Sequence, residues 1–262
     1  MHLLRLYWEQ RSYRTALVLG GASSLVALVQ FFLMGRFLQQ GNTFDGIRVY
    51  GGDIVSFLLT GSIFTGFVVI GLNAFSGYLQ EEQAAGTLES VLVMPVSVFK
   101  PMIFSGGAAL IGTISGSFAM VAVFGAILKV PFNIDILGSV SVLFLLVLTT
   151  SGLGLTGCGA LLVTKRGDPV KWTVVTVTTL LSGVAYPVTI LPEWLQLIAG
   201  FLPTTIALDG MRLALTQAAT PKELLPSLAG LAAWATIALA IGLWGMHTGL
   251  RIARRRGSLG EF

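Results

Sequence analysis

The segment EEQAAGTLESVLVMP, from Glu81 to Pro95, separates two apolar runs that are each long enough to cross a lipid bilayer. It carries three of the twelve acidic residues of the chain. Because charged side chains are costly inside a bilayer, this polar segment has to lie at a membrane face. A polar helix in that place is suited to dock into a groove of a soluble partner.

The composition of the whole chain is that of a membrane protein. Of the 262 residues, 54% are hydrophobic and 11% are charged, and the mean hydropathy is +0.84. Soluble domains contain about 25% charged residues. The only cysteine, Cys158, excludes a disulfide framework and a cysteine metal site. The basic residues lie at the ends of apolar runs and are not clustered on a face with aromatic residues, so we expect no nucleic-acid partner.

We expect an all-α membrane protein that forms a single transmembrane domain over residues 1–262. The six predicted spans cover residues 16–35, 54–79, 102–128, 136–163, 172–189 and 227–249. An even number of spans places both termini on the same side of the membrane. Eleven of the 16 Lys and Arg residues lie on that side and five on the other, so the positive-inside rule predicts cytoplasmic termini.

Two further segments are expected to lie at the membrane surface. Residues 1–14 predict an amphipathic interfacial helix, or only a lead-in to the first span. Before the last span, prolines divide an apolar stretch into short helices at about 192–200 and 204–217. We expect this pair to enter the outer leaflet and return as a re-entrant hairpin, with a hairpin resting on the membrane as the alternative. In its second helix, Asp209 and Arg212 are spaced to form an ion pair.

The segment between the second and third spans has the signals of a short helix that follows a break. The helix of the second span is expected to continue beyond the membrane until Gly86 interrupts it. Thr87 can then cap the next helix, and Glu89 places a carboxylate in its first turn, where the helix dipole favours an anion. Leu88 contributes to an apolar face, and Pro95 ends the helix.

Polar side chains within the spans are candidates for lining a translocation path. Thr173, Thr176 and Thr179 share one helical face of the fifth span, and Gly183 continues that face. The alternative for each threonine is a hydrogen bond to its own helix backbone. The candidate lining residues are Thr60, Thr65, Asn73, Thr173, Thr176, Thr179 and Ser182.

Two other classes of membrane protein are weighed on the residues alone. Ser115, in the sequence GTISGS, and His247 near the end of the sixth span allow a Ser/His hydrolase, although small residues around Ser115 more often serve helix packing. An ion-coupled carrier is disfavoured because the middle of the spans contains essentially no ionisable residue. No G-x-x-x-x-G-K-[ST] motif occurs, so the chain has no P-loop for a nucleotide.

Three features together resemble the type-2 ABC transporter permeases, which include drug and antibiotic exporters and lipid-linked polysaccharide exporters. They are the six spans, the motif E-x-x-x-G-T-L-E-x-x-x-x-x-P from Glu82 to Pro95, and the pattern YP…LPEWL…LP…ALDGMR from Tyr186 to Arg212. The resemblance covers nearly the whole chain. It implies that residues of about 87–94 form a cytoplasmic coupling helix, which docks on a separately encoded ATPase.

The resemblance also implies an outer gate built by the re-entrant helices of about 192–217, and a second, identical permease beside the first. It implies two ATPase subunits that bind ATP and Mg, surrounding membrane lipids, an amphiphilic substrate and a prokaryotic cytoplasmic membrane. It implies no catalytic residue, cofactor or metal in this chain. The implied coupling residues are Glu81, Glu82, Gly86, Thr87, Leu88, Glu89 and Pro95, and the implied gate residues are Tyr186, Pro187, Pro192, Trp194, Pro203, Asp209 and Arg212.

Overall fold

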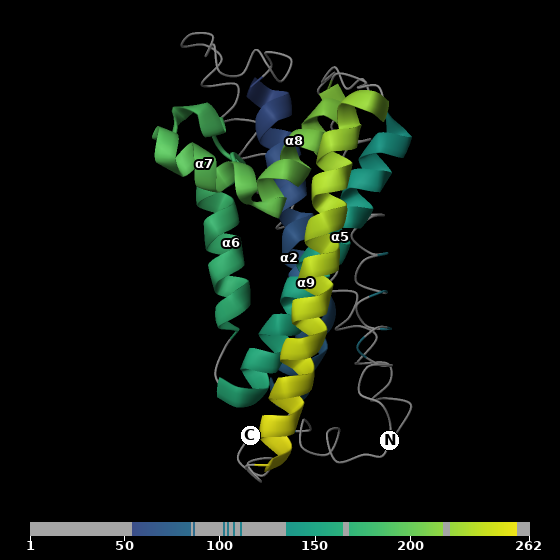
Figure 1. The fold of residues 1–262 in the computed structure, drawn as a ribbon, viewed down its shortest axis with the longest axis vertical. Coiled ribbons are helices and arrows are strands. Elements are labelled where there is room, and N and C mark those ends of the chain that lie inside the picture. The colour runs from purple at the N-terminus through teal and green to yellow at the C-terminus, as the bar shows by residue number, and fades with distance from the viewer. Residues whose placement is uncertain are drawn as a thin grey trace, which may run out of the picture.

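A computed structural model of the chain describes residues 54–84, 86, 102, 104, 107, 111, 135–164, 168–216 and 221–255. Every regular element in these residues is a helix (Figure 1). The expected all-helical class is therefore confirmed for this part of the chain. The expected interfacial helix, the first span, most of the third span and the coupling helix lie outside the described residues.

Three long helices form the centre of the molecule: α2 (Ile54–Ala84), α5 (Ile136–Thr164) and α9 (Pro221–Arg255). At a rise of 1.5 Å per residue they measure about 46, 44 and 52 Å, which exceeds the ~30 Å hydrocarbon core of a bilayer. All three are long and apolar enough to cross a membrane. The described residues thus contain three candidate spans, or four if one bent pair of short helices counts as a span.

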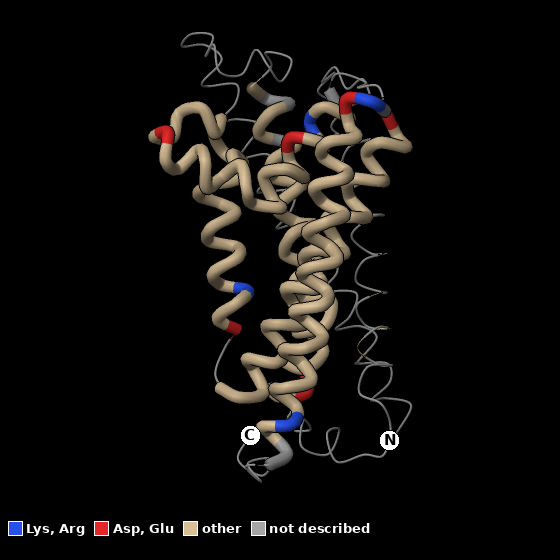
Figure 2. The backbone as a smooth tube through the Cα atoms, in the orientation of Figure 1, with Lys and Arg blue, Asp and Glu red and all other residues tan. Residues whose placement is uncertain are grey.

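The remaining helices return the chain to the end at which the long helices begin (Figure 1). α6 (Pro169–Leu181) runs opposite to the long helices and leads through the 3₁₀ helix η2 (Val188–Ile190) to α7 (Glu193–Phe201) and α8 (Pro203–Thr216). We call the end of the molecule that carries α7 and α8 the hairpin end. The opposite end, where a turn follows α2, is called the elbow end. Most charged residues lie near these two ends (Figure 2).

The fifth predicted span is wrong as one continuous helix over 172–189. α6 has 13 residues, about 20 Å, and is too short to cross a bilayer alone. Asp168 caps its start, because the Asp168 side chain accepts the backbone N–H of Lys171 at 2.9 Å. It ends before Gly183, which has a φ of 78°. Glycine adopts this left-handed conformation without a Cβ penalty, so Gly183 terminates the helix and does not continue its threonine face.

The long helices approach one another closely at glycines. A methyl group on Gly152 of α5 would lie 2.5 Å from the carbonyl carbon of Ala238 in α9. One on Gly249 of α9 would lie 2.5 Å from the carbonyl oxygen of Gly159 in α5, and one on Gly154 of α5 would overlap the backbone of α2. Between lipid-solvated helices the hydrophobic driving force is absent, and close van der Waals packing at small residues takes its place.

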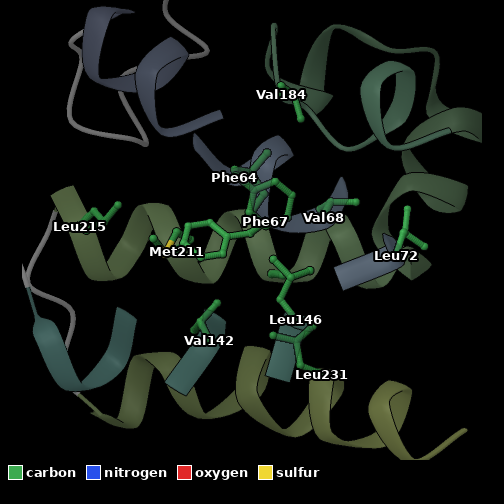
Figure 3. Packing of buried hydrophobic residues seen from close by; sticks show 12 residues of the cluster. Phe64, Phe67, Val68, Leu72, Val142, Leu146, Val184, Met211, Leu215 and Leu231 are labelled. Carbon is green, nitrogen blue, oxygen red and sulfur yellow. The ribbon is translucent and has the colours of Figure 1, made fainter. Parts of the chain in front are cut away.

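At the hairpin end, one apolar cluster joins α2, α5, α8 and α9 (Figure 3). Phe64 and Phe67 of α2 lie beside Met211 of α8, and Leu146 of α5 lies beside Leu231 of α9. A second cluster, at the elbow end, joins α2, α5 and α9 with Met102; its buried members are Leu79, Met102, Cys158, Leu161, Leu162, Met246 and Ala253. The two clusters hold the long helices together along most of their length.

One face of α9 presents a row of exposed apolar side chains. Ile237, Ile241 and Trp244 follow the helical spacing i, i+4, i+7, and 71% of Trp244 is exposed. A contiguous apolar row of this kind is an aggregation hazard in water but a suitable surface for lipid chains. The row and the long apolar helices together indicate a multi-pass membrane protein.

Candidate functional site

The hairpin of α7 and α8 covers the hairpin end of the molecule. The two helices meet at 83° across a short break. Pro192 directly precedes α7, and Pro203 is the first residue of α8. Proline is suited to both places, because a helix start needs no backbone N–H for an intrahelical bond. The helices lie within one residue of the ranges expected from these prolines.

Arg212 of α8 lies at the centre of this region and is only 1% exposed. Its Nη2 atom donates to the carbonyl oxygen of Gly183 at 2.9 Å and to that of Phe57 at 3.4 Å. Its guanidinium carbon lies 3.6 Å from the centroid of the Phe57 ring, which makes a cation–π contact. One side chain of α8 therefore contacts both the first turn of α2 and the turn that follows α6.

The assignment of Arg212 to the charges of the outer membrane face stays a prediction, and the structure adds that its side chain is buried. Its spacing from Asp209 on an amphipathic helix is typical of a solvent-facing pair, but its side chain is directed into the molecule. Asp209 is half-buried, and its pairing with Arg212 stays a prediction. The sequence does not reveal Phe57 and Gly183 as partners, because backbone carbonyls carry no residue-type signal.

A second buried contact joins the end of α6 to the start of α8. The hydroxyl groups of Ser182 and Thr204 lie 2.5 Å apart and are hydrogen-bonded, and both residues are buried. Close to them, the Tyr186 hydroxyl donates to the carbonyl of Leu180. Tyr186 therefore holds the turn after α6 against the last residues of that helix.

A third set of bonds fixes η2 to α7. Nε2 of Gln196 donates to the carbonyl of Leu191 at 2.7 Å and to that of Thr189 at 3.2 Å. Gln196 is not among the residues predicted from the sequence, although a single amide in the apolar helix EWLQLIAGF is a usable signal. Of the other predicted gate residues, Pro187 is buried before η2 and Trp194 is 63% exposed on α7.

The predicted path residues differ in how far they are buried. Thr173, Thr179 and Thr65 each donate to the carbonyl four residues earlier, at 2.8, 2.8 and 2.9 Å, as the alternative interpretation predicts. These bonds use the hydroxyl hydrogen and leave oxygen lone pairs available, and Thr173 and Thr179 are exposed along α6. Thr60 and Ser182 are buried in the molecule and line no open surface in this conformation. The half-buried members are Asn73, Thr65 and Thr176.

At the elbow end, α2 continues beyond Glu82 and is interrupted at Gly86, as the sequence predicts. Gly86 has a φ of 70°, and its N–H donates to the carbonyl of Gln83 at 3.1 Å. Glu81 is exposed, and Glu82 is half-buried. The remaining predicted coupling residues, which are Thr87, Leu88, Glu89 and Pro95, lie outside the described residues.

The described residues offer no metal site. No group of three or more His, Cys, Asp or Glu side chains that could hold a metal ion occurs among them. His247 is exposed on α9, and Ser115 lies outside the described part. The geometry of the described residues therefore gives no support to the alternative of a Ser/His hydrolase.

Comparison with known protein families decides the class of this protein. The sequence model of one family, described as ABC-2 type transporter, matches residues 4–216, which reach to the end of α8. The chain belongs to the ABC-2 type transporter family. No curated protein matches it.

Membership has three direct consequences. This ABC-2 protein is a permease of an ABC transporter and spans the membrane several times. Its family serves transport and is not itself catalytic. Membership in this family implies, in general, association with an ABC ATPase partner. The resemblance that the spans and the two motifs indicate is thereby confirmed at the level of the family.

Proposed function

We propose that this permease belongs to an exporter that moves an amphiphilic compound, such as a drug, a lipid or a lipid-linked glycan, out of a prokaryotic cell. The active assembly contains two identical permeases and two ATPase subunits, and the ATPases bind ATP and Mg. The permease lies in the cytoplasmic membrane with both termini in the cytoplasm. The elbow end is the cytoplasmic end, and the hairpin forms the outer gate.

The proposal rests on the continuity of helix α2 between the two ends of the molecule. The helix is continuous from Ile54, beside the hairpin, to Ala84, beside the elbow. A helix with all its backbone bonds formed transmits a displacement from one end to the other. The elbow at Gly86 leads directly into Thr87 and Glu89, the cap and first-turn carboxylate of the proposed coupling helix.

The exposed face of α6 supports the position of the substrate path. The oxygens of Thr173 and Thr179 lie on the same short helix as Trp172 and Leu180, which are 71% and 55% exposed. A surface that combines large apolar side chains with a few oriented acceptors suits an amphiphilic molecule. ATP binding closes the ATPases, displaces the coupling helices and tilts α2, and the gate then opens outward.

The coupling assignment is tested with Gly86→Pro and Glu89→Arg in the permease reconstituted with its ATPase. Proline cannot adopt the φ of Gly86 or donate its bond to Gln83, and arginine reverses a charge at the proposed docking surface. We expect each variant to lower ATP-driven transport at least about tenfold, a loss of about 1.4 kcal/mol of coupling, while insertion and dimer formation are retained. The readouts are transport and substrate-stimulated ATP hydrolysis with a panel of drugs, lipids and glycolipids.

Lys222→Glu is the matched charge reversal at the other end of the molecule, because Lys222 is an exposed residue at the start of α9, outside the gate hairpin. It is expected to retain transport. Unchanged transport in Gly86→Pro and Glu89→Arg would contradict the coupling assignment. Transport by the parent complex that persists without ATP and collapses with an ion gradient would contradict the exporter.

A further inference from the structure

A buried arginine needs strong partners, because removal of its charge from water costs several kcal/mol. The planar guanidinium offers five N–H donors and a face that stacks on aromatic rings. Arg212 uses both properties, with the ring and carbonyl of Phe57 on one helix and the carbonyl of Gly183 on another segment. These partners lie 155 and 29 residues away along the chain. The arginine therefore joins three segments that are distant in sequence.

The backbone of α2 touches the same turn directly. Gly61 lies one helical turn after Phe57, on the same face. A methyl group on Gly61 would overlap the carbonyl oxygen of Val184 and lie 3.1 Å from its carbon. No side chain therefore separates α2 from the turn after α6. Gly183 lies beyond the end of α6, so no helical N–H competes for its carbonyl oxygen.

We propose that Arg212, Phe57 and Gly183 form a clamp through which the gate hairpin follows the movement of α2. We call these three residues the Arg212 clamp. The inference rests on the proposed function, in which the displacement of α2 starts at the elbow end. Apolar packing is non-directional and allows helices to slide, whereas stacking and carbonyl hydrogen bonds fix both distance and orientation. The clamp thus transfers a tilt of α2 to α8 and to the turn after α6.

The single cysteine of the chain makes a distance measurement at both ends practicable. In a Cys158→Ser background, spin labels at Gln80 and Arg251 report movement of α2 relative to α9 at the elbow end. Labels at Leu197 and Leu225, which are 70% and 63% exposed, report movement of α7 relative to α9 at the hairpin end. Each pair is measured by pulsed electron resonance in the complex with the ATPase, with and without MgATP and vanadate.

In the parent protein we expect MgATP with vanadate to shift the distance distribution of both label pairs. Arg212→Met keeps a side chain of similar length and removes the donors and the charge. It is expected to retain the shift at the elbow end and to lose the shift at the hairpin end. Arg212→Lys is expected to keep at most about half of the hairpin shift, because one ammonium cannot stack and bridge two carbonyls as the guanidinium does.

The two label pairs separate failure of the clamp from failure of the proposed function. A full hairpin shift in Arg212→Met or in Arg212→Lys would overturn the clamp, and so would a parent protein that shifts only at the elbow end. A parent protein without an elbow shift would overturn the ATPase coupling itself. If Arg212→Met cannot be purified as a monodisperse protein, the hairpin shift of Arg212→Lys is the measurement that tests the clamp.

Discussion

At the residue scale, Gly183 determines two properties of the site at once. Its φ of 78° ends α6 and directs its carbonyl toward Arg212. A side chain at this position would be strained by the backbone conformation, and its Cβ would lie 2.9 Å from Cγ2 of Val188. The length of α6 and the partner of the buried arginine therefore depend on the same residue.

Gly183→Ala is expected to destabilise the permease by about 1–2 kcal/mol, because alanine in the left-handed region carries a Cβ penalty and here also meets Val188. Thermal unfolding in detergent measures the change. Gly200→Ala is the matched control, since a Cβ at this helical position of α7 has no neighbour within 4 Å. Equal melting temperatures for the two variants would contradict the conformational role of Gly183.

At the element scale, the contact of α5 with α9 is the most extensive helix packing in the described residues. Gly152 and Gly159 of α5 are seven residues apart, and so are Gly242 and Gly249 of α9. A spacing of two turns places each pair on one face. Methyl groups at these positions would meet backbone atoms of the other helix, which cannot rotate away as a side chain can. The four glycines therefore set the distance between the helix axes.

Gly242→Ala is expected to cost about 1–3 kcal/mol through overpacking, because its Cβ would overlap the carbonyl oxygen of Gly152. Gly66→Ala in α2 serves as the control, since nothing lies within 4 Å of its Cβ and alanine is the better helix former. Resistance to unfolding by heat and by denaturing detergent is compared for both. A Gly242→Ala protein as stable as Gly66→Ala would show that the helices adjust without cost.

The sequence predicts most of these elements and few of their contacts. Long apolar runs, Gly86 and the prolines before α7 and α8 carry strong local signals, because each restricts the backbone where it stands. Gly183 carries a weaker signal, because a glycine in an apolar run fits a membrane helix equally well. The partner of its carbonyl, Arg212, lies 29 residues away along the chain and gives no local signal at Gly183. The Arg212 clamp could not be predicted, because the groups that receive the guanidinium are two backbone carbonyls and one aromatic ring, none of which is marked in the sequence as a partner of an arginine.

At the scale of the whole molecule, the two ends of the helix bundle differ in what they offer a partner. The hairpin end is covered by α7, α8 and the buried contacts around Arg212 (Figure 1). The elbow end offers the exposed Glu81 and the turn at Gly86. This asymmetry is consistent with the proposed ATPase at one side of the membrane and the proposed gate at the other.

The orientation is tested with single-cysteine variants and a membrane-impermeant maleimide. In a Cys158→Ser background, Lys222→Cys at the hairpin end is expected to react in intact cells, because its side chain is exposed at the start of α9. Glu81→Cys is expected to react only after permeabilisation. The parent protein, whose thiol is buried, should react only after denaturation. The reverse pattern for the two variants would invert the topology.

The glycine contact between α5 and α9 also has a consequence for biosynthesis. α9 is the last described helix to be made, so α5 enters the membrane before the helix with which it has its most extensive contact. Until then Gly152 and Gly159 lack the α9 backbone that packs against them in the folded protein. A nascent or truncated permease without α9 is therefore expected to be less stable in the membrane, and insertion of α9 completes the contact.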